Sequence, residues 1–189
     1  MSESGYDGWL NKYFDDISGA QSIVELGCGW GADTSFLCGT GHFVTSCDID
    51  SSKLDSIRKR YPGIETCLFD MREILPFDTD SADIFVASLC FQFFTEAELR
   101  GILNEIKRVL KDAGALLCRL ISEKGVKQGI EGESILAPGL YMTKEGLKQF
   151  YNESRIMEVF RDWDIISIEE YETIKKPKRL VVFEMFLQS

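Results

Sequence analysis

Short apolar runs alternate with amphipathic runs along the first two thirds of the chain, and each apolar run ends near a polar or glycine-rich turn. The apolar runs predict strands at 22–26, 43–48, 64–70, 82–88 and 115–121. The amphipathic runs between them predict helices at 32–38, 51–61 and 95–111. Strands alternating with helices in this way are typical of an α/β fold with a mostly parallel sheet.

The helix predicted at 95–111 carries the clearest signals. Thr95 and Glu98 have the spacing of a capping box, which marks the start of a helix. The apolar positions that follow at helical spacing are Leu99, Ile102, Leu103, Ile106, Val109 and Leu110. Gly114 lies just beyond the last basic residues of this run and predicts its end.

The pattern changes after residue 121. Residues 122–141 contain four glycines and a proline without clear periodicity, which predicts a long loop that covers or builds a site. Two helices are predicted after it, at 143–151 and 153–160. The final apolar runs, 163–173 and 179–188, are separated by only five residues and predict an antiparallel hairpin.

Length and composition indicate one folded unit. The chain has 189 residues, of which 44% are hydrophobic and 28% charged, and no linker separates two halves. We therefore expect a single domain over 1–189. The net charge of −10 argues against a nucleic-acid partner, because nucleic acids are bound mainly by clustered Lys and Arg. A small neutral or cationic ligand fits this charge better.

The sequence also bears on location and metal content. It has no stretch of about 18 apolar residues, and its N-terminal residues are polar and acidic rather than signal-like. We expect a cytoplasmic protein with no membrane partner. The six cysteines form no C-x-x-C pair and have no zinc-ligand spacing, so we expect reduced, mostly packed thiols and no metal site.

Residues 24–34, VELGCGWGADT, carry three glycines on alternate positions directly after a predicted strand. Gly27, Gly29 and Ala32 satisfy the G-x-G-x-x-G/A pattern of dinucleotide sites, and Asp48 ends the next strand about 20 residues later. Three interpretations stand at this point: a dinucleotide site, a site for another nucleotide-like cofactor, and a tight turn without a ligand.

Charge separates the ligands. Glu25 at the end of the first strand would repel a pyrophosphate, whereas a sulfonium cofactor such as S-adenosylmethionine carries two positive groups against one carboxylate. Asp48 and Asp70 follow the next two strands, so the three acids should line one edge of a parallel sheet. We expect Asp48 to accept from the ribose hydroxyls and Asp70 from the adenine amino group. The alternative for each acid is a helix N-cap.

Four stretches, 24–34, 44–54, 69–94 and 105–120, resemble successive motifs of the class I S-adenosylmethionine-dependent methyltransferases, over roughly residues 20–121. Within that superfamily the chain is similar to the small single-domain enzymes related to the tellurite-resistance methyltransferase. The resemblance implies a Rossmann-like three-layer sandwich whose seven-stranded, mostly parallel sheet has its last strand antiparallel.

The resemblance also implies cofactor-binding residues. Those expected to contact S-adenosylmethionine are Glu25, Gly27, Cys28, Gly29, Asp48, Ile49, Asp70, Met71, Ser88 and Leu89. Residues 1–19 would form an N-terminal lid helix, with Trp9 or Tyr13 either facing the cofactor or packing in the core. Residues 122–141 would form the loop on the substrate side.

No catalytic residue is assigned from the sequence, but three substrate-side candidates stand out. Gln92 occupies the place where relatives carry a histidine, so an orienting hydrogen bond is expected there rather than a base. Arg119 is an unusual charge for an interior strand, and it either reaches an anionic substrate or pairs with a neighbouring acid. Tyr141 either faces the pocket or packs.

These features predict an enzyme that methylates a small molecule. Two alternatives remain, a non-catalytic module that binds S-adenosylmethionine or S-adenosylhomocysteine, and an enzyme that methylates a basic protein. The sequence leaves the oligomeric state open between monomer and homodimer.

Overall fold

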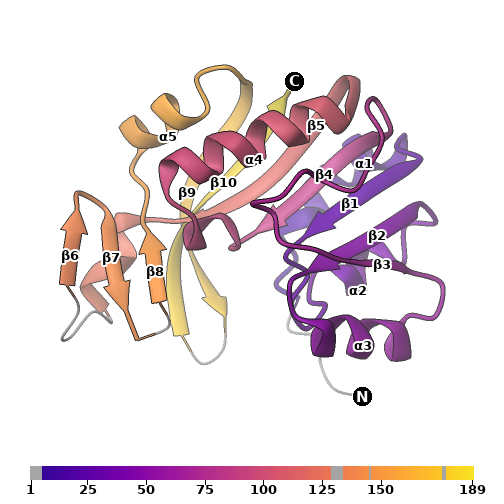
Figure 1. The fold of residues 1–189 in the computed structure, drawn as a ribbon, viewed down its shortest axis with the longest axis horizontal. Coiled ribbons are helices and arrows are strands. Elements are labelled where there is room, and N and C mark those ends of the chain that lie inside the picture. Colours follow the sequence, from indigo (N-terminus) through magenta and orange to yellow (C-terminus); the bar gives the residue numbers. More distant parts are fainter. Residues whose placement is uncertain (1–5, 129–133, 145, 176–177) are drawn as a thin grey trace.

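The computed structural model describes residues 6–128, 134–144, 146–175 and 178–189. Its centre is a seven-stranded sheet with helices on both faces, the predicted three-layer arrangement (Figure 1). The strand order is β3-β2-β1-β4-β5-β10-β9. The strands are β1 (Ser22–Leu26), β2 (Phe43–Asp48), β3 (Glu65–Leu68), β4 (Ala82–Ser88), β5 (Leu110–Ile121), β9 (Asp164–Lys175) and β10 (Lys178–Gln188).

The direction of the strands agrees with the prediction. β1 to β5 pair in parallel, and β10 runs antiparallel to both of its neighbours, β5 and β9. The hairpin predicted at the C-terminal end is therefore confirmed, and its strands are longer than the apolar runs suggested. Because the parallel strands all end at one edge, β1, β2 and β4 deliver their C-terminal residues to the same place.

The helices are short except for one. They are η1 (Trp9–Tyr13), α1 (Phe14–Ser18), α2 (Thr34–Leu37), α3 (Ser51–Arg60), η2 (Phe91–Phe93), α4 (Glu96–Val109), η3 (Glu123–Gln128) and α5 (Glu153–Val159). Among the described residues, no helix combines the length and the apolar character needed to span a bilayer.

Helix α4 begins as predicted and ends earlier than predicted. The Thr95 backbone N–H donates to Glu98 Oε2 at 2.7 Å, and the Glu98 N–H donates to Thr95 Oγ1 at 3.3 Å, which completes the capping box. The helix stops at Val109 rather than near Gly114. Leu110 pairs with Ala82 of β4, so pairing in the sheet takes over before the glycine is reached.

The two faces of the sheet bury two separate cores. α4 and α5 cover the larger core, and η1, α1 and α2 cover the smaller one. Strand β5 contributes to both by alternation, because Leu116, Cys118 and Leu120 enter the larger core while Ala115 and Leu117 enter the smaller one. Residue 119 therefore points to the face that carries the N-terminal helices.

The region after β5 differs most from prediction. Where a loop was expected at 122–141 and a helix at 143–151, the structure has η3 and a three-stranded antiparallel sheet. Its strands are β6 (Ser134–Ala137), β7 (Leu140–Thr143) and β8 (Gly146–Gln149). Gly139 and Gly146 have φ values of +72° and +101°, which a helix does not accommodate and a hairpin turn does. The helix prediction is therefore wrong, and part of the predicted loop, 129–133, lies outside the described residues.

The described cysteines form no disulfide. Cys28, Cys47, Cys90 and Cys118 are buried, Cys67 is half-buried and Cys38 is exposed. Burial raises the pKa of the buried thiols Cys28, Cys47 and Cys118, which keeps them protonated.

Candidate functional site

The glycine turn, residues 27–31, follows β1 at the C-terminal edge of the parallel strands. Gly27, Gly29 and Gly31 have φ values of +65°, +54° and +82°, a left-handed conformation that side chains disfavour. A Cβ added at Gly27 would lie 2.6 Å from the Cβ of Cys90, and one at Gly31 would lie 2.4 Å from Ile57 Cδ1. At Gly29 the nearest such atom is the Gly27 carbonyl oxygen at 4.0 Å. The turn is therefore packed on two sides and leaves bare backbone at its middle.

Asp48 fastens this turn to the end of β2. Its Oδ2 accepts from the Gly29 N–H at 2.9 Å, and its Oδ1 accepts from the Asp50 N–H at 3.0 Å and from Lys53 Nζ at 3.3 Å. Asp48 is 7% exposed, whereas the adjoining Ile49 side chain is 62% exposed. The hydrogen-bonded carboxylate of Asp48 thus contacts the Gly29 backbone, and the exposed apolar side chain of Ile49 follows it in the chain.

Glu25 lies beneath the turn rather than on its open side. Its Oε2 accepts from Thr34 Oγ1 and from Ser46 Oγ, both at 2.6 Å, and the residue is 2% exposed. Burial raises the pKa of Glu25 to about 7, although the two hydroxyl donors oppose this change. The carboxylate ties β1 to β2 and to the first residue of α2.

The raised pKa of Glu25 predicts a pH-dependent stability. Between the ordinary pKa of a glutamate and pH 7, Glu25 is protonated in the folded protein and ionised in the unfolded chain. The free energy of unfolding therefore falls as pH rises through that window. Glu25→Gln keeps an acceptor for both hydroxyls and removes the titration. We expect wild type to lose on the order of 1–2 kcal/mol relative to Glu25→Gln between pH 5 and 8.

Urea unfolding of both proteins at several pH values measures this difference. Parallel stability profiles for the two proteins would show that Glu25 does not take up a proton on folding in this range.

Asp70 and Met71 follow β3 and approach the turn from its other flank. The Asp70 carboxylate accepts from the Arg72 backbone N–H at 3.0 Å and from Arg72 Nη1 at 2.8 Å. The Met71 Cε atom lies 3.8 Å from the position of a Cβ on Gly27. Met71 is thereby brought against the glycine turn, and Asp70 is held at the rim by Arg72.

Ser88, Leu89 and Arg119 form the third part of the site, where β4 and β5 end. Arg119 donates through Nε and Nη2 to Ser88 Oγ, at 3.0 and 2.9 Å. The Leu89 N–H donates to the Arg119 carbonyl oxygen at 3.0 Å, with Leu89 at φ +54°. Arg119 Nη1 also pairs with Asp7 Oδ2 at 2.5 Å. In the structure Arg119 thus pairs with a neighbouring acid, which is one of the two alternatives given for it.

The N-terminal aromatic residues are buried in this region. Trp9 donates through Nε1 to Asp33 Oδ1 at 2.8 Å, and Tyr13 donates its hydroxyl to Glu184 Oε1 at 3.0 Å. Both belong to the smaller core. Through Trp9 the segment connects to Asp33, the residue just before α2.

The other two substrate-side candidates lie on η2 and on β7 of the small sheet. Gln92, on η2, is 7% exposed, and among the described residues nothing hydrogen-bonds to its enclosed Oε1. Tyr141, on β7, packs edge-on against Phe150 with 5.3 Å between ring centroids. The small sheet reaches η2 where Lys148 Nζ lies 5.7 Å from the Phe93 ring centroid.

Sequence reasoning missed two sets of supporting residues. Thr34 and Ser46, the partners of Glu25, showed no signal, because only the strand register places Ser46 opposite Glu25. Asp7 was missed as well, although the charge of Arg119 on an interior strand was a signal that some acid must lie nearby.

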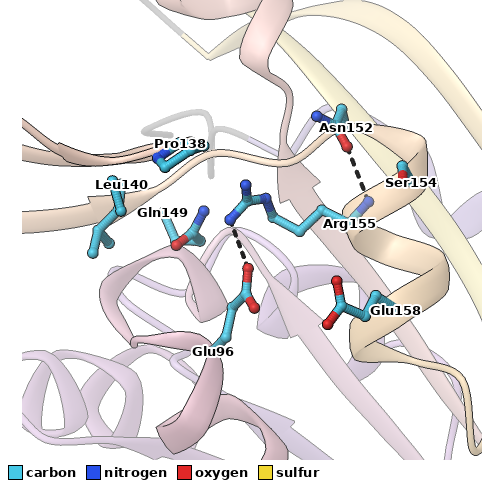
Figure 2. Close-up of a pocket in the computed structure, with 9 residues that line it drawn as sticks. Glu96, Pro138, Leu140, Gln149, Asn152, Ser154, Arg155 and Glu158 are labelled. Carbon is cyan, nitrogen blue, oxygen red and sulfur yellow. Dashed lines mark hydrogen bonds and ion pairs between the residues drawn. The ribbon is translucent and has the colours of Figure 1, made fainter.

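A cavity of about 490 Å³ lies elsewhere, between the start of α4, α5 and the small sheet. Figure 2 shows Arg155 extending across it, with Nη1 bonded to Glu96 Oε1 at 2.6 Å and the Gln149 side chain beside its tip. Pro138 and Leu140 form its apolar wall. This cavity shares no lining residue with the glycine turn, Asp48 or Ser88.

Comparison with known proteins identifies the family. The family model described as a methyltransferase domain matches residues 24–118, which is half of the chain and runs from β1 into β5. The phthiotriol/phenolphthiotriol dimycocerosates methyltransferase of Mycobacterium tuberculosis is 36% identical over 106 residues, covering 52% of this chain and 37% of that protein. The chain matches less than half the length of the first curated relatives.

Solved structures share the whole fold at low identity. The 1,6-didemethyltoxoflavin-N1-methyltransferase of Burkholderia thailandensis, solved with S-adenosylhomocysteine bound, superposes with a TM-score of 0.75 at 14% identity, over 100% of this chain and 79% of that one. TehB from Haemophilus influenzae superposes with a TM-score of 0.72 at 18% identity, over 96% and 62%. The chain belongs to the class I S-adenosylmethionine-dependent methyltransferases, whose cofactor is S-adenosylmethionine.

Proposed function

We propose that the protein is a methyltransferase (EC 2.1.1.-) that transfers a methyl group from S-adenosylmethionine to a small-molecule acceptor. The observation that carries the proposal is the bare Gly29 backbone held by Asp48 at the C-terminal edge of the parallel strands. In open α/β sheets that edge is where ligands bind.

The residues present fit the cofactor. A side chain at Gly29 would project into the space that a ligand needs for close approach, and the glycine leaves that space free. Beside its two backbone donors and Lys53, Asp48 retains acceptor capacity on Oδ2 for a ribose hydroxyl, and the exposed Ile49 offers an apolar contact for a base. Asp70 and Met71 stand on the adenine side of this arrangement.

The methionine part would lie on the other side of the turn. Gly27, Cys28, Ser88 and Leu89 surround that position, with Gly27 packed against Cys90 just after β4. Glu25 acts from beneath, where its side chain accepts hydrogen bonds from Thr34 at the first position of α2 and from Ser46 on β2. This role differs from direct contact with the cofactor.

Methyl transfer is an in-line displacement, so the protein must mainly position the acceptor atom and exclude water. When bound, the cofactor supplies an electrophilic methyl group on a positively charged sulfur. Gln92 lies on η2, four residues after the end of β4, and its Oε1, which has no hydrogen-bond partner among the described residues, is proposed to accept from an N–H or O–H of the acceptor. An amide does not take up a proton at neutral pH, so Gln92 orients the acceptor and the chain's residues assign no general base.

The small-molecule assignment is supported by charge. A net charge of −10 disfavours phosphate-rich partners and leaves basic proteins as the competing substrate class. The N-terminal segment, of which residues 6–19 are described, is proposed as the lid of the site, and the region 122–141, of which 129–133 lie outside the described residues, is proposed as its substrate side.

Calorimetric titration with S-adenosylmethionine, S-adenosylhomocysteine and NAD tests the cofactor. We expect micromolar binding of the first two and none of NAD. Release of S-adenosylhomocysteine is then followed with a small-metabolite extract and with a basic protein such as histone as acceptors. Turnover with the extract supports the proposal, turnover only with histone supports the protein substrate, and binding without any turnover supports the non-catalytic module.

A further inference from the structure

Arg119 is a buried cation in the middle of the sheet. Its side chain is 5% exposed, and its strand neighbours are Ser88 on β4 and Glu184 on β10. Two of its nitrogens bond to Ser88, and the guanidinium lies 4.7 Å from the centroid of the Trp9 ring. A cation held this far from water requires an anion beside it.

Asp7 is that anion. Glu184, the buried acid next to Arg119 in the strand register, is occupied by Lys12 Nζ at 2.5 Å and by the hydroxyls of Tyr13 and Tyr171. Within the described residues the ion pair of Arg119 is with Asp7. Asp7 comes from the N-terminal segment rather than from the sheet, so the counter-ion of a sheet residue is carried by a separate piece of chain.

The Asp7 side chain is more exposed to solvent than the Arg119 side chain. Its Oδ2 accepts from Arg119 Nη1 and from Thr173 Oγ1 at 3.1 Å, its carboxylate also interacts with the Trp9 backbone N–H, and its side chain is 20% exposed compared with 5% for Arg119. Asp7 is therefore the more solvent-accessible member of the pair. Opposing burial, the hydrogen bond from Arg119 holds the pKa of Asp7 below its ordinary range, so the acid stays ionised.

Arg119 also belongs to the proposed methionine side of the site. It donates to Ser88, and its carbonyl oxygen accepts from Leu89. We propose that Arg119 is the carboxylate-binding residue of this site and that Asp7 is its exchangeable counter-ion, which a ligand carboxylate replaces on Nη1. This inference rests on the proposed function.

The exchange is favourable for a physical reason. Replacing one carboxylate by another leaves the buried guanidinium paired, so the cost of exposing an unpaired buried charge is not incurred. Placing a second carboxylate beside Asp7 would leave one net negative charge in the same buried place. Asp7, once released, frees Thr173 and the start of the N-terminal segment, which couples ligand binding to the position of that segment.

The carboxylate has two possible sources, the amino-acid end of the cofactor and an anionic acceptor. Calorimetry distinguishes them by two measurements. The first compares the affinity for S-adenosylhomocysteine with that for its decarboxylated analogue, which keeps the amine. The second measures the binding of benzoate to protein that is already saturated with S-adenosylhomocysteine. The proteins are wild type, Asp7→Asn, Thr173→Val and Arg119→Gln. Asp16→Asn, an exposed acid in the same segment, is the matched control.

If the carboxylate comes from the cofactor, Asp7→Asn removes the group that competes with it for Arg119. The Asp7→Asn protein then prefers S-adenosylhomocysteine over the decarboxylated analogue roughly 10- to 100-fold more strongly than wild type does. Thr173→Val leaves the ion pair and loosens Asp7, so it shifts the preference the same way by less. Arg119→Gln abolishes the preference, and Asp16→Asn leaves it at the wild-type value. For an acceptor carboxylate, Asp7→Asn leaves this preference unchanged and instead strengthens benzoate binding to the saturated protein.

An unchanged preference together with unchanged benzoate binding in both Asp7→Asn and Thr173→Val overturns the inference and leaves Asp7 as a structural partner. If wild type binds no S-adenosylhomocysteine at all, the proposed function itself is wrong. The two failures are therefore separable in the same experiment.

Discussion

Gly27→Ala is expected to destabilise the protein by roughly 2–5 kcal/mol. Gly27 has φ +65°, and a left-handed conformation costs a residue with a Cβ about 1–2 kcal/mol. The new methyl group would also lie 2.6 Å from the Cys90 Cβ, an atom fixed to the backbone that cannot rotate away. Forcing an extra carbon into a packed contact adds about 1–3 kcal/mol. Urea unfolding followed by circular dichroism measures the loss.

Gly41→Ala is the matched control for Gly27→Ala. Gly41 also has positive φ, +81°, but no atom in the described part of the chain lies within 4 Å of its Cβ position. It should therefore show only the conformational part of the loss, and the difference between the two variants isolates the contact with Cys90. Equal losses in both variants would contradict a close approach between the glycine turn and the segment after β4.

Asp48→Ala is expected to weaken S-adenosylhomocysteine binding by more than about a hundredfold. Hydrogen bonds to a charged acceptor contribute about 1.5–3 kcal/mol each, and the proposed site uses this carboxylate both for the ribose and for the Gly29 N–H. The variant loses the ligand contacts and the tether of the glycine turn together. Isothermal titration calorimetry gives the affinity, and urea unfolding separates it from the loss of stability.

Asp55→Ala provides the control for Asp48→Ala. Asp55 lies on α3, is exposed and pairs with Arg58 on the same helix, so its removal changes the net charge equally without touching the turn. Its affinity should equal that of wild type. If Asp48→Ala also keeps the wild-type affinity, Asp48 is a structural residue and the cofactor does not bind beside it.

The sequence predicted the five parallel strands and the terminal hairpin because their signals are local and strong. Buried strands of a parallel sheet require continuous apolar runs, and helices between them require a separate periodicity, so the alternation itself specifies the class of fold. The glycine turn was predicted for a similar reason. Glycines on alternate positions after a strand have few roles other than a backbone that turns sharply or approaches something closely.

The small sheet was not predictable in the same way. Its strands are four residues long, and Leu147, Phe150 and Tyr151 have the i, i+3, i+4 spacing of a helix. Pairing between β7 and β8, with Tyr141 opposite Lys148, decides the outcome. A contact between chain segments, unlike a periodicity, is not present in either segment alone.

Glu25 and Arg119 show the same division at single residues. The sequence by itself determined that an acid ends the first strand and that an unusual cation lies on the fifth, and it thereby determined the chemistry available at that edge of the sheet. Only the tertiary structure decided where these charges point. The strand register places Glu25 opposite Ser46, and Glu25 is buried beneath the turn. The N-terminal segment brings Asp7 to Arg119. Direction and partnership depend on strand register and packing, which arise when the chain folds on itself.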